Sequence, residues 1–124
     1  LLVHTFWILG YPGETYEEMN QTVNFALSSG ADSFSFSILS PLPGTPIYRR
    51  VIKENLWWKG RTMDDLMYRS SLVQVDGFSN PQEFEKFVDE SNIKANLLLK
   101  ENDPKRFIQK YGEGTNEKSF VKQT

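Results

Sequence analysis

Two short loops rich in glycine and proline are the segments of this chain best suited to hold a ligand. The first is 10–15, Gly-Tyr-Pro-Gly-Glu-Thr, and the second is 40–45, Ser-Pro-Leu-Pro-Gly-Thr. Each loop directly follows an apolar, strand-like run. Glycine permits backbone conformations and close approaches that other residues do not, and proline fixes the shape of a turn. Both loops are therefore candidates for lining a cofactor-sized site at the ends of two strands.

Few other residues offer independent chemistry. The 124 residues include no cysteine and one histidine, so this polypeptide alone cannot build a disulfide, a thiolate-held zinc site or an iron–sulfur cluster. No carboxylate pair and no Ser/His/Asp set has a spacing typical of catalysis. His4 lies in a strand-like run and is expected to be a hydrogen-bonded core residue rather than a ligand. The loop 10–15 also lacks the endings of a P-loop and of a dinucleotide fingerprint.

The composition indicates one globular domain. The chain is 39% hydrophobic and 14% aromatic, which is enough to form a core. Its 14 basic and 16 acidic residues give a net charge of −2 without long charged runs, which argues against nucleic acid and anionic membranes as partners. No apolar stretch is long enough to span a membrane, and no signal peptide is present, so we expect a cytoplasmic protein. The chain begins inside an apolar run without methionine, so we expect a fragment of a longer protein.

The elements around the two loops form a strand–helix–strand unit. The run 1–9 is apolar at successive positions and predicts a strand buried on both faces of a parallel sheet. Thr15 and Glu18 have the spacing of a capping box, which predicts a helix that ends near Gly30. The run 33–39 alternates phenylalanine or isoleucine with serine, as in a strand with one apolar and one polar face.

This connectivity places both loops at one edge of the sheet. A strand, a helix and a second strand within about forty residues make the two strands parallel. Ligands of parallel α/β sheets bind outside the carboxyl ends of the strands, where both loops lie. If the sheet curls into a barrel, Ser35 and Ser37 either line its lumen or are simply small residues on a curved sheet.

The rest of the chain predicts mainly helices. Further helices are expected over 47–54, from Thr62, from Asn80 to about Lys100, and from Asp103 to Tyr111, with a brief strand or an extended connector over 72–75. We divide the chain into a strand–helix–strand–helix part (1–58), a helical C-terminal extension (59–112) and a flexible tail (113–124). Trp57 and Trp58 either cover the core or close over a substrate.

The two loops and their strands resemble those of radical S-adenosylmethionine (radical SAM) enzymes. Residues 4–15 resemble the fifth strand and loop of the large group with a Gly-aromatic/Leu-Pro-Gly-Glu-Thr loop, which includes methylthiotransferases and many cobalamin-binding members. Residues 34–48, which end in Ser-Pro-Leu-Pro-Gly-Thr-Pro-Ile-Tyr, resemble the sixth strand and exit loop of the cobalamin-binding subgroup. The resemblance covers about residues 1–58.

The resemblance implies an α/β fold in which the βαβ unit is part of an incomplete (β/α) TIM-like barrel. Such a barrel binds S-adenosylmethionine against a [4Fe-4S] cluster, which reduces the sulfonium and releases a 5′-deoxyadenosyl radical that abstracts hydrogen from a substrate. The Cys-x3-Cys-x2-Cys loop and the Gly-Gly-acid motif of the family have no counterpart here. The chain thus resembles the C-terminal part of such an enzyme. Its expected partner is the N-terminal part of the same enzyme, and cobalamin is a candidate further cofactor of the parent protein. This chain alone should be inactive.

The resemblance implies that four residues of this chain form the adenine-binding site. Ile8 occupies the strand position that lies against the adenine ring. Gly10 occupies the strand-end position where a side chain would crowd that ring. Leu39 and Ser40 occupy the positions where backbone groups pair with the adenine edge. An apolar cover with backbone donors and acceptors is what an adenine ring requires.

Three further residues complete the candidate cofactor-binding set. They are Gly13, Glu14 and Ser37. The looser family pattern Gly-x-Ile-x-Gly-x-x-Glu fits only partly, because Phe6 replaces its first glycine, Gly13 stands where the acid is expected and Glu14 follows one place later. Glu14 either contacts a ligand or anchors the loop, where an acid before a helix is favoured in any case.

A second hypothesis does not require the chain to be part of an enzyme. In it, the chain is a small α/β binding or interaction module whose Pro-Gly loops and C-terminal helices dock a partner. Neither hypothesis identifies a substrate.

Overall fold

The computed structural model describes residues 2–66 and 70–111, and this part of the chain has an α/β fold. Its elements in chain order are β1 (His4–Leu9), α1 (Tyr16–Leu27), β2 (Ser33–Ile38), α2 (Pro46–Glu54), the 3-10 helix η1 (Met63–Asp65), α3 (Pro81–Asn102) and α4 (Pro104–Tyr111). The predicted tail, 113–124, and the last residue of the predicted extension, Gly112, lie outside the described residues. No helix of the described part is long and apolar enough to cross a membrane.

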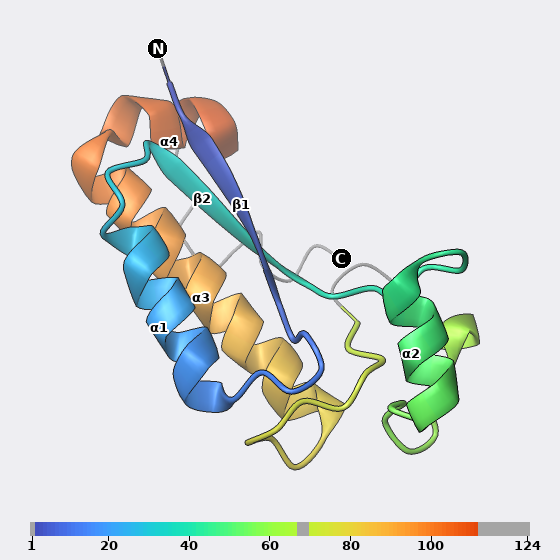
Figure 1. The fold of residues 1–124 in the computed structure, drawn as a ribbon. Helices are drawn as coiled ribbons and strands as arrows, with labels where there is room; N and C mark the ends of the chain where they lie inside the picture. The colour runs from blue at the N-terminus through green and yellow to red at the C-terminus, as the bar shows by residue number, and fades with distance from the viewer. Residues whose placement is uncertain (1, 67–69, 112–124) are drawn as a thin grey trace.

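The predicted strand–helix–strand unit is confirmed. β1 and β2 pair in parallel, with a register that runs from His4 opposite Ser33 to Leu9 opposite Ile38 (Figure 1). The Thr15 side chain accepts a hydrogen bond from the Glu18 N–H at 3.1 Å, and the Glu18 carboxylate accepts one from the Thr15 N–H, so the predicted capping box starts α1. The helix returns the chain to the start of the sheet, and both strand ends therefore point the same way.

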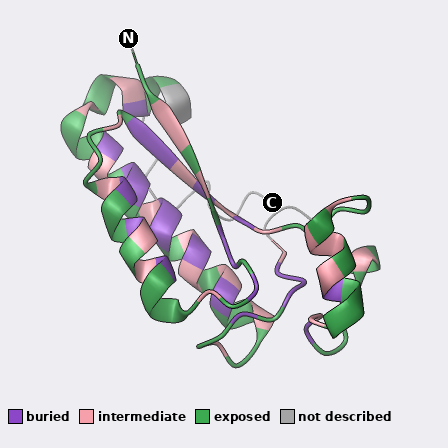
Figure 2. Cartoon of the chain, viewed as in Figure 1, coloured by how far each residue is buried: buried purple, intermediate pink, exposed green. Residues whose placement is uncertain are grey.

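One face of the sheet is covered by α1 and α3 (Figure 1). The helices turn their buried residues toward this face, as the purple segments in Figure 2 show. The main buried side chains of this core are Leu9, Met19, Val23, Ala26, Phe34, Phe36, Ile38, Val75, Phe84, Val88 and Ala95. The predicted alternation of β2 is confirmed, because its phenylalanines and isoleucine lie in this core.

The other face of the sheet is largely open. Phe6 is 77% exposed and Ile8 is 63% exposed. The prediction that the first strand is buried on both faces is therefore wrong, since both covering helices lie on the opposite face and leave these two side chains in solvent. The strand also begins at His4, later than the apolar run suggested, and Leu2 and Val3 precede it as exposed residues.

The outer edge of β2 is closed by a side chain. Asn92 of α3 accepts a hydrogen bond from the Phe36 N–H and donates one to the Phe36 carbonyl, both at 2.9 Å. The Asn92 residue is only 4% exposed. One amide side chain thus makes the two bonds that a third strand would make at this position. The helical pattern predicted α3 but not this role, because Asn92 is a polar residue among the apolar positions of the helix.

The segment after α2 folds back over the end of α3. The Trp58 indole N–H donates to the Ser71 hydroxyl at 2.8 Å, and Trp57 and Val73 form an isolated antiparallel bridge. Of the two interpretations of the tryptophans, core cover is confirmed for Trp58, which packs in the core. Ile52 of α2 is 52% exposed.

Replacing Asn92 by alanine should lower the free energy of unfolding by about 2 to 4 kcal/mol. The reason is that the Phe36 N–H and carbonyl would both be buried without partners. Urea unfolding monitored by circular dichroism measures the change. The control is Asn24→Ala on the exposed side of α1, for which a change within about 0.5 kcal/mol is expected. Equal effects of the two variants would contradict the edge-closing role of Asn92.

Candidate functional site

The two candidate loops follow the carboxyl ends of β1 and β2; the first turns back toward α1, and the second leads away to α2 (Figure 1). The Leu39 N–H donates to the Leu9 carbonyl at 3.0 Å, so the pairing of the strands continues to the start of both loops. The Arg50 guanidinium of α2 lies 6.0 Å from the centre of the Tyr11 ring, which links the element after the second loop to the first loop. Both segments therefore start at the same edge of the sheet.

The first loop is a tight turn held by its own residues. The Glu14 N–H donates to the Tyr11 carbonyl at 2.9 Å, and the Glu14 carboxylate accepts a hydrogen bond from the Gly10 N–H at 3.1 Å. Gly10 and Gly13 have φ values of +97° and +91°, which side-chain-bearing residues rarely adopt. Of the two roles considered for Glu14, the loop-anchoring role is the one for which the structure provides contacts.

Gly10 is also required by the core. A Cβ atom at this position would lie 2.9 Å from Cζ of Phe84 and 3.6 Å from Cγ2 of Val75. A Cβ at Gly13 would have no atom within 4 Å. The glycine at position 10 therefore lets the strand end pack directly on α3, whether or not a cofactor also approaches it.

Ile8 and Ser37 lie opposite each other on the open face of the sheet. They are register partners, and the Ile8 side chain projects beside the half-buried Ser37 at the carboxyl end of the strands. The Leu39 N–H is occupied by Leu9, and the Ser40 carbonyl accepts from the Leu42 N–H at 3.0 Å. The Leu39 carbonyl and the Ser40 N–H make no backbone hydrogen bond with another described residue.

His4 lies at the other end of the same face. Its Nδ1 is 2.5 Å from the Ser33 hydroxyl and its Nε2 is 3.0 Å from the Ser35 hydroxyl. The predicted hydrogen bonding of His4 is confirmed, but its predicted place in the core is wrong, because the residue is half-buried on the open face of the sheet. Ser35 is thus a partner of His4, whereas Ser37 lies two residues nearer the loops. Among the described residues, no group of three His, Cys, Asp or Glu side chains could hold a metal ion.

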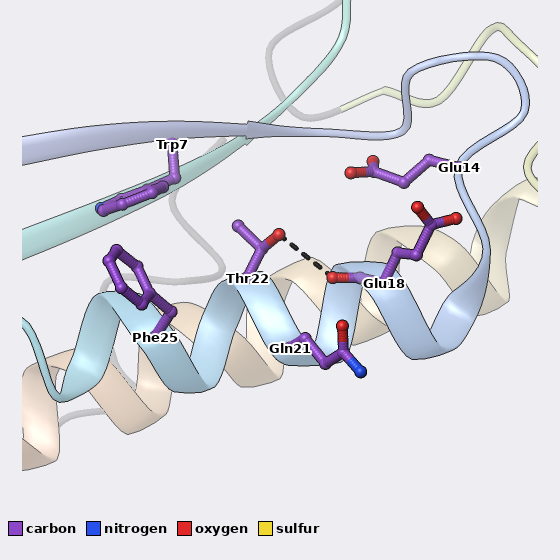
Figure 3. Close-up of a pocket in the computed structure, with 6 residues that line it drawn as sticks. All are labelled: Trp7, Glu14, Glu18, Gln21, Thr22 and Phe25. Carbon is purple, nitrogen blue, oxygen red and sulfur yellow. Dashed lines mark hydrogen bonds between the residues drawn. The ribbon is translucent and has the colours of Figure 1, made fainter.

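A pocket of about 340 Å³ lies on the opposite side of β1, between the strand and α1 (Figure 3). Its lining residues are Trp7, Glu14, Glu18, Gln21, Thr22 and Phe25. Trp7 and Phe25 form an edge-to-face pair with ring centres 6.0 Å apart. The sequence did not predict this pocket, since Trp7 and Phe25 read only as apolar positions of a strand and a helix. Glu14 faces this pocket, so it is separated by the sheet from the open face that carries Ile8.

Replacing Gly10 by alanine should destabilise the protein more than replacing Gly13 by alanine. Both variants must adopt a strained positive φ, which costs about 1 to 2 kcal/mol, but only Gly10→Ala also drives a methyl group into Phe84, at a further cost of about 1 to 3 kcal/mol. Urea unfolding of the two variants measures the difference. Adding Phe84→Leu should reduce the difference, and equal destabilisation by both alanines would contradict the packing argument.

Replacing Glu14 by alanine should expose the Gly10 amide. Without its carboxylate acceptor, that N–H should exchange with solvent about tenfold faster, as expected for the loss of one charge-assisted hydrogen bond. Hydrogen exchange followed by NMR reports this amide directly. Glu17→Ala, an exposed acid in the first turn of α1, is the matched control and should leave the Gly10 amide unchanged. Unchanged exchange in Glu14→Ala would rule out the anchor.

Comparison with known proteins relates the chain to methyltransferases. No family model and no solved structure matches it. An uncharacterized methyltransferase of Pyrococcus horikoshii is 38% identical over 66 residues, which cover 49% of this chain and 14% of the relative. The cytidylyl-2-hydroxyethylphosphonate methyltransferase of Streptomyces wedmorensis is 27% identical over 96 residues, which cover 73% of this chain and 18% of the relative. The chain is therefore similar to segments of methyltransferases and spans less than a fifth of the length of either relative.

Proposed function

We propose that this chain is the C-terminal portion of a radical SAM enzyme and supplies part of its adenine cleft. The observation that carries the proposal is the parallel pairing of β1 with β2, which sets Ile8 beside Ser37 and brings both glycine–proline loops to one edge. Similarity to segments of two methyltransferases is consistent with it. In this proposal, residues 1–58 are the last part of an incomplete barrel and residues 59–112 are its helical extension.

The residues at this edge fit a nucleoside. Ile8 offers an exposed apolar side chain that can cover one face of an adenine ring. The Leu39 carbonyl can accept a hydrogen bond from the exocyclic amino group, and the Ser40 N–H can donate one to a ring nitrogen. Gly13 has no side chain and open space around it, so a ligand can approach the loop backbone closely at this position, whereas the space that a Gly10 side chain would need is taken by Phe84. Ser37 adds a hydroxyl on the same face.

The cluster must be held by another part of the enzyme. The chain has no cysteine, so the three cluster ligands would come from the N-terminal part of the same protein. When bound, the [4Fe-4S] cluster supplies the electron that cleaves S-adenosylmethionine. This chain's own contribution is to bind and orient the adenosyl group and to form one wall of the barrel. Alone it should not turn over S-adenosylmethionine.

Methyl transfer is the reaction class that the relatives favour for the parent enzyme. Both carry the word methyltransferase in their names. Resemblance of the second loop to the cobalamin-binding subgroup extends the proposal to cobalamin as a second cofactor of the parent. The substrate of the parent protein stays outside the proposal, because no described residue selects one.

An interaction module is the second candidate, and the open face of the sheet favours it. Phe6 and Ile8 are large apolar side chains on that face, and both are mostly exposed. Exposed apolar residues grouped on one face are typical of a surface that another protein covers. A module of this kind would have no preference for an adenine nucleoside, which gives a direct way to separate the two candidates.

Titration with S-adenosylhomocysteine, a stable analogue of the cofactor, tests the adenine cleft. Because the chain provides only part of the cleft, we expect a dissociation constant of about 1 mM, equivalent to about 4 kcal/mol of binding free energy. NMR should show saturable shifts of the Gly10, Leu39 and Ser40 amides. Ile8→Glu should weaken binding about tenfold by removing the apolar cover.

The matched control is Ile52→Glu on α2. Ile52 is 52% exposed and Ile8 is 63% exposed, so the two substitutions change similar surfaces at different places. Binding should be unchanged in the control. Absence of any shift up to about 10 mM analogue, which corresponds to less than about 3 kcal/mol, would contradict the cleft and favour the interaction module.

A further inference from the structure

We propose that the pocket between β1 and α1 binds a guanidinium group on a short alkyl chain, the chemistry of an arginine side chain. The pocket has a volume of about 340 Å³, which is enough for a small ligand of this class. It lies on the α1 side of the sheet (Figure 3), whereas Ile8 of the proposed adenine cleft lies on the open face. The inference therefore does not rest on the proposed function.

Two aromatic side chains, Trp7 and Phe25, line one end of the pocket (Figure 3). Their rings meet edge to face with centres 6.0 Å apart. The Trp7 indole N–H donates to the Thr5 hydroxyl at 2.9 Å, which fixes the ring and uses its only donor within the protein. Phe25 is 65% exposed, so a ligand can reach this aromatic pair from solvent. Tryptophan is the aromatic side chain that attracts cations most strongly, and a planar guanidinium stacks well on such rings.

Two carboxylates, those of Glu14 and Glu18, line the other end of the pocket (Figure 3). Each uses its Oε1 atom in a local hydrogen bond at 3.1 Å, Glu14 with the Gly10 N–H and Glu18 with the Thr15 N–H. These bonds hold both carboxylates in place, and neither Oε2 atom accepts a hydrogen bond from a described residue. Neither carboxylate forms an ion pair with a lysine or arginine of the described residues. The pocket thus combines an aromatic wall with two fixed negative charges.

The remaining polar groups favour a guanidinium over other cations. The Thr22 hydroxyl donates to the Glu18 carbonyl at 3.1 Å, so toward a ligand it can only accept a hydrogen bond. A ligand that meets this hydroxyl and two carboxylates needs several N–H donors. A guanidinium has five such donors in one plane, and it forms strong hydrogen bonds with carboxylates. A quaternary ammonium has no N–H to offer, and a primary ammonium lacks the flat surface that stacks on an indole.

Titration of the full chain with ethylguanidinium chloride tests the site, with the Trp7 indole N–H and the Thr22 amide as NMR reporters. Ethylurea is the matched control ligand, because it has nearly the same shape but no charge. Sodium chloride keeps the ionic strength constant in both titrations. We expect saturable shifts with a midpoint on the order of 10 mM for ethylguanidinium, and binding of ethylurea that is at least about tenfold weaker.

A double variant, Glu14→Gln with Glu18→Gln, tests the role of the two charges. Glutamine keeps an acceptor oxygen at both positions and still serves in a capping box, so the turn and the start of α1 should be preserved. The midpoint for ethylguanidinium should rise about tenfold. Glu17→Gln is the matched control, since Glu17 is an exposed acid of the same helical turn that does not line the pocket. It should keep the wild-type midpoint.

A blocked tripeptide with a central arginine distinguishes the two sources of this chemistry, a free guanidino compound and an arginine side chain of another protein. Tighter binding of the peptide than of ethylguanidinium identifies a protein side chain as the ligand, weaker binding identifies a small free compound, and both results support the proposal. No saturable shift up to about 100 mM ethylguanidinium, equal binding of ethylurea, or an unchanged midpoint in the double glutamine variant would overturn it. The comparison of the two ligands on the wild-type chain decides the matter even if a variant fails to fold.

Discussion

The structure depends on the two hydrogen bonds between Asn92 and the backbone of Phe36. Two parallel strands are a small sheet, and such a sheet is stable only when its polar groups are paired and one face is covered. Asn92 meets both needs at once. It pairs the Phe36 N–H and carbonyl at the outer edge of β2, and it fixes α3 against the apolar face of the sheet. Phe84 then packs on Gly10, and the first loop takes its place over the end of the helix. α3 thus supports both the edge strand and the start of the first loop.

The same contact gives the sheet two different edges. On the β2 side, Asn92 ends the backbone pairing. On the β1 side, β1 pairs with β2 alone within the described part of the chain, and Phe6 and Ile8 stand exposed beside the free edge. A barrel assembled from this piece would therefore grow only from β1, which agrees with the proposal that the remaining strands come from the N-terminal part of the enzyme. The open face and the free edge are then two aspects of one incomplete unit.

Local patterns in the sequence predicted most of the helices and strands. They did not predict the contacts between residues that are distant in the sequence. Capping pairs such as Thr15 with Glu18, and the alternating run before Leu39, depend on neighbouring residues and were confirmed. The burial of β1 was predicted wrongly because an apolar run does not reveal which layers are present. The role of Asn92 was missed because this residue acts across more than fifty residues of sequence, on Phe36. For the candidate site, the sequence predicted where both loops lie in the chain. It did not predict that the Glu14 side chain faces the pocket between β1 and α1.

The free edge of β1 has a consequence for how this polypeptide behaves in solution. Unpaired strand edges recruit other strands, and natural proteins protect them with charges, prolines or covering segments. Between His4 and Leu9 the chain has neither a formally charged acid or base nor a proline. Two copies could thus pair through their β1 edges and shield their aromatic side chains from water. Self-association that grows with concentration, and that an added complementary strand suppresses, is the expected behaviour of a sheet with such an edge.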